Sequence, residues 1–66
     1  MDTGIRISDP NGKVRKIYVI PSNGLGSEAY VKTGLFKRTS MYAASNRGAI
    51  EKLMRRLRHE GWWDIR

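Results

Sequence analysis

The second half of the chain carries apolar residues at helical spacing. At about 100° per residue, the stretch 40–60 gathers an apolar stripe made of Tyr42, Ala43, Ile50, Leu53, Met54 and Leu57. The opposite stripe is cationic and consists of Lys52, Arg55, Arg56 and His59. We therefore predict one long helix over 40–60, with one side against a core and the other side in water.

Capping residues define the ends of this helix. A shorter helix beginning at Ser45 or Asn46 is the alternative, but the apolar phase extends further back along the chain and favours the longer one. Thr39 or Ser40 then serves as the N-cap, because its hydroxyl can accept a hydrogen bond from a first-turn amide. Gly61 is placed to end the helix, and the residues 61–66 form a tail.

Two strands are predicted before the helix, over 4–8 and 13–20, joined by the turn Asp9-Pro10-Asn11-Gly12. Pro10 suits the second position of a type I turn, Asp9 can cap that turn, and Gly12 can take the left-handed conformation of a G1 bulge.

The bulge sets the pairing of these strands. It places Ser8 opposite Val14, Ile7 opposite Arg15, Arg6 opposite Lys16 and Ile5 opposite Ile17. One face then holds Ile5, Ile7, Ile17 and Val19, and the other holds Arg6, Lys16 and Tyr18. A two- or four-residue loop would put Val14, Lys16, Tyr18 and Ile20 beside the isoleucines. We prefer the bulge because it separates charge from the core.

A third strand is predicted over 28–36, where residues of high β-propensity are frequent. Its core-facing positions would be Ala29, Val31, Thr33 and Leu35, with Phe36 turning inward near the end. The chain is then a single α+β domain: a three-stranded antiparallel β-meander with one C-terminal α-helix packed on one face (β-β-β-α).

Charge narrows the function. Thirteen Lys and Arg against six Asp and Glu leave a net charge of +7 on 66 residues, which attracts polyanions. The chain has no Cys and a single His, so a disulfide is excluded and a zinc site is not indicated. The acids form no paired set, and His59 lies among arginines, so we expect no catalysis, no cofactor and no metal. No apolar run is long enough for a membrane span, and we expect a cytoplasmic protein.

Two surfaces are candidates for binding nucleic acid. The first is the open sheet face with Arg6, Lys16, Tyr18, Tyr30 and Lys32, extended at the sheet edge by Lys37 and Arg38. The second is the helix face with Lys52, Arg55, Arg56 and His59. We expect DNA rather than RNA, bound mainly through phosphates. The size and composition would suit a regulator encoded by a phage or mobile element.

The adjacent Trp62 and Trp63 cannot both point inward from an extended tail. One should close the end of the core, and the other is left to stack on a base, contact a partner or join two copies into a homodimer. The alternative function is accordingly a small inhibitor or adaptor that docks on an acidic protein surface through Trp62 or Trp63 and the basic helix.

The run Gly34-Leu35-Phe36-Lys37-Arg38-Thr39, leading to Ala43 and Ala44, resembles the last strand and helix start of the sheet-reading DNA-binding domains of phage integrases and plant AP2 factors. The arrangement is also similar to the sheet and second helix of double-stranded-RNA-binding domains. The resemblance implies a sheet face, opposite the helix, that enters a groove.

Overall fold

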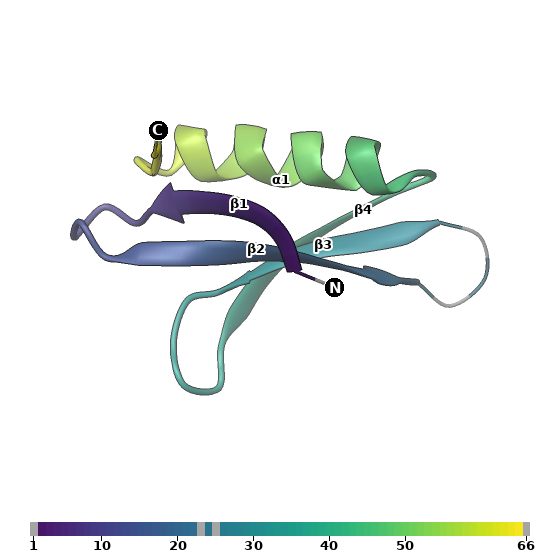
Figure 1. The fold of residues 1–66 in the computed structure, drawn as a ribbon, viewed down its shortest axis with the longest axis horizontal. Helices are drawn as coiled ribbons and strands as arrows, with labels where there is room; N and C mark the ends of the chain where they lie inside the picture. The colour runs from purple at the N-terminus through teal and green to yellow at the C-terminus, as the bar shows by residue number, and fades with distance from the viewer. Residues whose placement is uncertain (1, 23, 25, 66) are drawn as a thin grey trace.

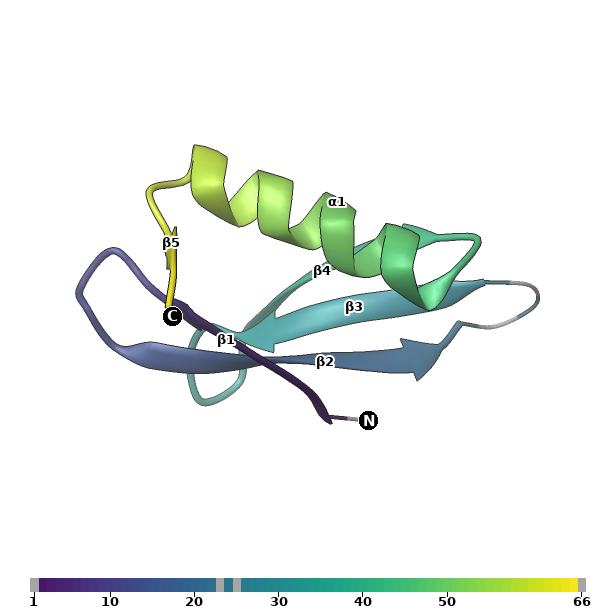
Figure 2. The same cartoon turned by 45° about the horizontal axis from the view of Figure 1, so that its top comes forward.

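The computed structural model describes residues 2–22, 24 and 26–65. Over these residues the chain forms five strands and one helix: β1 (Asp2–Ser8), β2 (Val14–Pro21), β3 (Ser27–Lys32), β4 (Arg38–Ala43), α1 (Asn46–His59) and β5 (Trp63–Asp64). The strands make one antiparallel sheet in the order β4-β3-β2-β1-β5. The sheet curls into a half-barrel, and α1 lies across one of its faces (Figure 1, Figure 2).

The predicted three-stranded β-β-β-α topology is wrong, although the fold is α+β. Residues 38–43, of which 40–43 were predicted as the start of the helix, form strand β4 and pair with β3 along its length. Pairing with β3 outweighs the helical phase of Tyr42 and Ala43. The short β5 then pairs with β1 at the other edge of the sheet.

The third strand also ends earlier than predicted. It stops at Lys32, and the backbone amides of Thr33 and Gly34 donate to the carbonyl oxygen of Lys37 at 3.0 and 3.3 Å. Residues 33–37 therefore form the turn of a β3–β4 hairpin, which we call the tip loop. The predicted inward positions of Leu35 and Phe36 are wrong, because both side chains lie on this loop and are exposed.

The helix begins at Asn46, which was the alternative to the predicted start at residue 40. Ser45 is its N-cap, with an extended backbone and a hydroxyl oxygen that accepts from the amide of Gly48 at 3.0 Å. Neither Thr39 nor Ser40 has that role, since both lie within β4. Gly48 allows the helix to lie close to the end of β4. A Cβ at this position would be only 3.3 Å from the Cβ of Ala43.

Gly61 ends the helix as predicted. Its φ is +96°, its amide donates to the carbonyl of Arg58, and the amide of Trp62 donates to the carbonyl of Leu57. This pair of bonds is a Schellman motif, in which the residue after the glycine folds back onto the last turn. Trp62 is consequently brought into the core.

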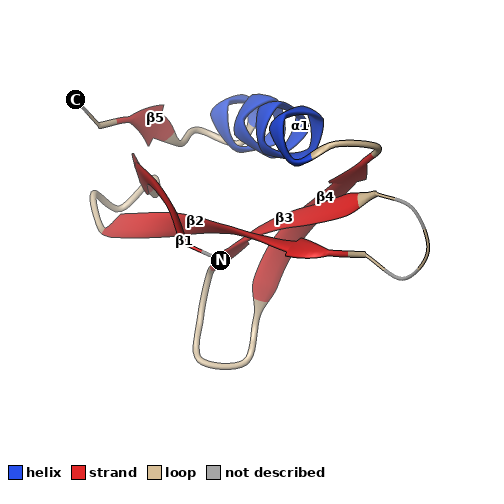
Figure 3. Ribbon diagram, turned by 45° about the vertical axis from the view of Figure 1, so that its right-hand side comes forward, coloured by secondary structure: helices blue, strands red, loops and turns tan. Residues whose placement is uncertain are grey.

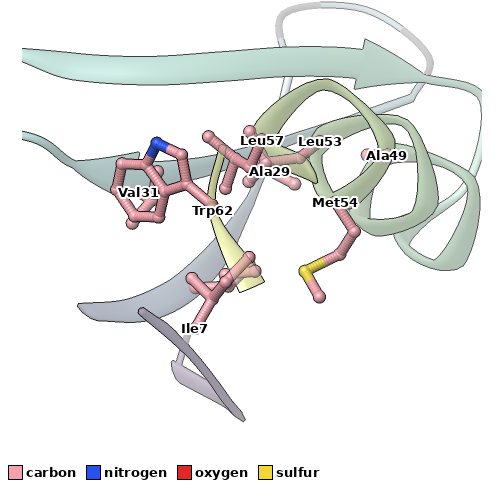
Figure 4. Close-up of a cluster of buried hydrophobic side chains, with 9 residues drawn as sticks. Ile7, Ala29, Val31, Ala49, Leu53, Met54, Leu57 and Trp62 are labelled. Carbon is pink, nitrogen blue, oxygen red and sulfur yellow. The ribbon is translucent and has the colours of Figure 1, made fainter. Parts of the chain in front are cut away.

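One core lies between α1 and the inner face of the sheet, the face that α1 covers (Figure 4). Ala49, Leu53 and Leu57 recur every four residues on the helix and are fully buried. They pack with side chains from the strands and the tail, including Ile7, Ile17, Ala29, Val31 and Trp62. The sheet residues between these face away from the helix, as period-2 alternation requires.

The β1–β2 turn and its register are confirmed up to Arg6. Gly12 has φ +89°, and Asp9 accepts from the amides of Asn11 and Lys13 at 2.9 Å each. The pairs Ser8–Val14, Ile7–Arg15 and Arg6–Lys16 form as predicted. Beyond Arg6 the register shifts and Asp2 pairs with Tyr18, so the predicted Ile5–Ile17 pairing does not form. Ile5 still packs against the core.

Leu53→Ala should lower the free energy of unfolding by about 2–5 kcal/mol, because it removes a fully buried side chain and leaves a cavity. Lys52→Ala, one residue away on the exposed side of α1, is the matched control and should change it by less than about 0.5 kcal/mol. Denaturant unfolding measures both. Equal midpoints for wild type and Leu53→Ala would contradict this core.

Asp9 should make the turn sensitive to acid. The amide of Lys13, then that of Asn11 and the Arg15 guanidinium, hold the pKa of Asp9 below its usual value. The lowered pKa means that this stabilisation is present above about pH 4, the unfolded value, and is lost as the pH falls through the folded value.

Asp9→Asn keeps an acceptor oxygen and removes the charge, so it should lower the denaturant midpoint at pH 7. The difference from wild type should narrow below about pH 4, where the wild-type carboxylate also becomes neutral. A difference that stays constant from pH 7 to pH 3 would assign the effect to the shape of the turn alone.

Candidate nucleic-acid interface

Four basic positions line up across the outer face of the sheet, the face turned away from α1. Arg6 on β1 is opposite Lys16 on β2, and Lys32 on β3 is opposite Arg38 on β4. β2 and β3 are antiparallel and Ile17 pairs with Val31. Lys16, one residue before Ile17, is therefore next to Lys32, one residue after Val31. We call this set the cation row: Arg6, Lys16, Lys32 and Arg38.

Ion pairing leaves the excess charge in few places. Each of the six acidic residues pairs with a different Lys or Arg, at 2.8 to 3.7 Å. Among the described residues, the basic side chains without an ion-pair partner are Arg6, Lys13, Lys32, Lys37, Lys52 and Arg55. Three of them, Arg6, Lys32 and Lys37, lie on the outer face or on the tip loop beside it.

Two tyrosines stack next to the cation row. The rings of Tyr18 and Tyr30, on neighbouring strands, have centroids 5.4 Å apart and planes 21° apart. The guanidinium of Arg38 lies over the Tyr30 ring, 4.8 Å from its centroid. Arg38 also pairs with the buried carboxylate of Glu28 at 3.4 Å. Arg38 is therefore held in place by a ring and a carboxylate before any ligand arrives.

Two acids reduce the positive charge of this face. Asp2 pairs with Lys16 at 3.7 Å, with both side chains about half exposed. Glu28 is almost completely covered, and Tyr42 and Ile20 are its neighbours in the sheet. Neither acid pairs with Arg6 or Lys32. Arg6 at the β1 end of the row and Lys32 on β3 thus keep their charge.

The tip loop stands beside the cation row. Figure 1 and Figure 3 show the loop between β3 and β4 projecting on the side of the sheet opposite α1. Lys37 lies on this loop, Lys32 is the last residue of β3 before it, and Arg38 is the first residue of β4 after it. The predicted sheet-face residues Arg6, Lys16, Tyr18, Tyr30, Lys32, Lys37 and Arg38 are thus on one side of the molecule.

The helix candidates form a separate surface. Lys52, Arg55, Arg56 and His59, together with Met41 of β4, line an open hollow of about 490 Å³. Arg56 is paired with Glu60 at 3.4 Å, and its guanidinium also contacts the sulfur of Met41. Lys52 donates to the carbonyl of Tyr42 at 3.4 Å. This surface lies on the helix side of the sheet, and the outer face cannot share a ligand groove with it.

The two tryptophans have different positions. Trp62 is 9% exposed and belongs to the core, so of the two tryptophans it is the one that closes the end of the core. Trp63 is 50% exposed and pairs with Ser8, which in turn pairs with Val14 on β2. Paired residues share a face of the sheet, which places Trp63 near the end of the outer face. Arg66, the end of the predicted tail, lies outside the described residues.

No family model, curated protein or solved structure matches the chain. The resemblance to the integrase and AP2 domains rested on residues that have other roles here. Gly34–Thr39 forms the hairpin turn and the start of β4, so a strand, and not the helix, follows the turn. Within the described part of the chain, no group of three metal-ligating side chains comes together. Among the same residues there is no helix with the length and apolar content that a membrane span requires.

Substitution of the tryptophans should separate their roles. Trp62→Ala should lower the free energy of unfolding by about 3–5 kcal/mol, the usual cost of truncating a buried ring, whereas Trp63→Ala should have a small effect. Acrylamide quenching of the single-tryptophan proteins is a second measurement. Trp63→Phe should leave a protected emitter and Trp62→Phe an accessible one. Equal quenching of both would contradict the placement of Trp62 in the core.

Proposed function

We propose that this protein binds nucleic acid without catalysis, and that duplex DNA docks on the outer face of the sheet. The observation that carries the proposal is the cation row, in which Arg6 and Lys32 have no acidic partner among the described residues. Lysine and arginine that meet phosphates release condensed counterions, and this release drives association.

The dimensions of the row match a duplex. Neighbouring strands lie about 4.8 Å apart, so a row across four strands spans about 14 Å between its outermost backbones. The major groove of B-DNA is about 12 Å wide. A sheet face seated over that groove would bring Arg6 toward the phosphates of one strand and Arg38 toward those of the other.

The tyrosine stack supplies contacts of another kind. Tyr18 and Tyr30 occupy the next positions along the strands from Lys16 and Lys32 on the same face, so they are brought to the groove with the row. Their hydroxyls can donate and accept hydrogen bonds, and their rings restrict one another. The cations would then fix the position of the duplex, and the tyrosines would contact the edges of the bases.

The alternative, an inhibitor or adaptor that uses tryptophan and the basic helix together, has less support. Trp62 is buried. Trp63 lies in β5 at one edge of the sheet, and the hollow beside Met41 adjoins β4 at the other edge. One protein partner would have to reach around the molecule to use both.

Binding to mixed-sequence duplex should weaken steeply with salt. With about four to six phosphate contacts, log affinity against log salt should have a slope of about −4 to −5. Arg6→Ala, Lys16→Ala or Lys32→Ala should each make the slope less steep by about 1. Lys52→Ala and Arg55→Ala remove the same charge from the helix surface and should leave it unchanged. Fluorescence anisotropy across a salt series measures all of these.

The reverse pattern, with the helix variants changing the slope and the sheet variants silent, would move the interface to α1. Affinity for heparin equal to that for DNA would show attraction without recognition. An absence of DNA binding at low salt would overturn the proposal.

A further inference from the structure

The tip loop exposes two large apolar side chains almost completely. Leu35 is 90% exposed and Phe36 is 94% exposed. The loop that carries them has a defined shape, because the amides of Thr33 and Gly34 both donate to the carbonyl of Lys37. A chain with a core as small as this one places two of its larger apolar residues where they add nothing to folding. Their position indicates contact with another molecule.

The surroundings of the tip are cationic. Leu35 and Phe36 line a hollow of about 200 Å³ together with Lys32, Gly34, Lys37 and Arg38. Lys32 and Arg38 are also the β3 and β4 members of the cation row. Because the loop projects on the side of the sheet opposite α1 (Figure 3), a polyanion seated on the cation row would meet the tip.

We propose that Leu35 and Phe36 act as a wedge that enters a base step of the bound duplex. This inference rests on the proposed function. The tip would reach past the phosphates at the edge of the docked major groove and enter the step from the neighbouring minor groove. Apolar side chains inserted there unstack the step and kink the DNA, and the bent duplex can then contact more of the protein. In this chain the bend would bring phosphates on either side of the step toward Lys37 and toward the cation row.

The geometry favours a duplex over a lipid surface. Two apolar residues are a shallow anchor for a bilayer. A projecting tip would also hold a flat membrane away from Arg6 and Lys16, which lie on the strands farther from the loop. A duplex is narrow and can be bent, so it can contact the tip and the row together.

The test uses a synthetic duplex with 2-aminopurine beside a central TA step, since pyrimidine–purine steps are easily unstacked. Wild-type protein should raise the 2-aminopurine fluorescence on binding. Phe36→Ser and Leu35→Ser should abolish the rise and weaken binding about tenfold, within the range of one lost stacking contact. Their salt slope should equal that of wild type, because no charge is removed.

Two controls separate the wedge from charge and from folding. Phe36→Trp keeps a flat apolar ring and should retain the fluorescence rise. Lys37→Ala should lower the salt slope by about 1 and also retain the rise. Leu35 and Phe36 make so little contact with the rest of the chain that the serine variants should unfold at the wild-type denaturant midpoint.

The outcomes distinguish this inference from the proposed function. Wild type that binds the duplex with the expected salt slope, and Phe36→Ser that binds equally well, would overturn the wedge and leave the proposed function standing. Wild type that binds no duplex would overturn both. Phe36→Ser that keeps DNA binding but loses association with phosphatidylserine vesicles would overturn the wedge in favour of a lipid surface.

Discussion

The structure depends on the burial of one helical stripe against one face of one sheet. Ala49, Leu53 and Leu57 cover the inner face, and no described helix or strand lies over the other side. The outer face must therefore meet water or a partner. Side chains there are selected by what they contact outside the molecule, which is why lysine, arginine and tyrosine can gather on a sheet whose inner face holds the apolar core.

The register of the sheet decides which residues reach that outer face. The turn at Asp9 and Gly12 places one extra residue between β1 and β2, and the pairs that follow put Arg6 and Lys16 on the same side. A slip of one residue would exchange the two faces of a strand and carry its charges into the core. The hydrogen bonds of one buried carboxylate at the end of the hairpin thus help to form the cation row.

Much of the local structure follows from sequence because local chemistry determines it. The turn at 9–12 needs only its own residues, and Gly61 needs only a helix before it. The same glycine could also have identified Trp62 as the buried ring, because the residue after a C-cap glycine packs against the last helical turn. The adjacency of the two tryptophans alone leaves the choice between them open.

The remaining elements depend on partners distant in sequence. Tyr42 and Ala43 can belong to a helical stripe or to a strand, and β3 resolves the ambiguity by pairing with them. A two-residue strand such as β5 has no pattern of its own. The predicted end of β3 is wrong for another reason. Leu35 and Phe36 are apolar and have the composition of a buried strand, but they lie in the exposed turn of the hairpin.

The wrong predictions at the helix start and at the tip loop have different physical causes. The helix start was predicted wrongly because the apolar residues before Ser45 fit a helical period as well as a strand. In the folded chain these residues lie in a strand that suits them. At the tip loop the conflict persists in the folded state, because apolar side chains remain in water where a turn would normally be polar. Sequences depart from local rules chiefly where function requires it. The tip loop is next to Lys32 and Arg38, and the position of this departure is itself an argument that the hairpin and the cation row serve one ligand.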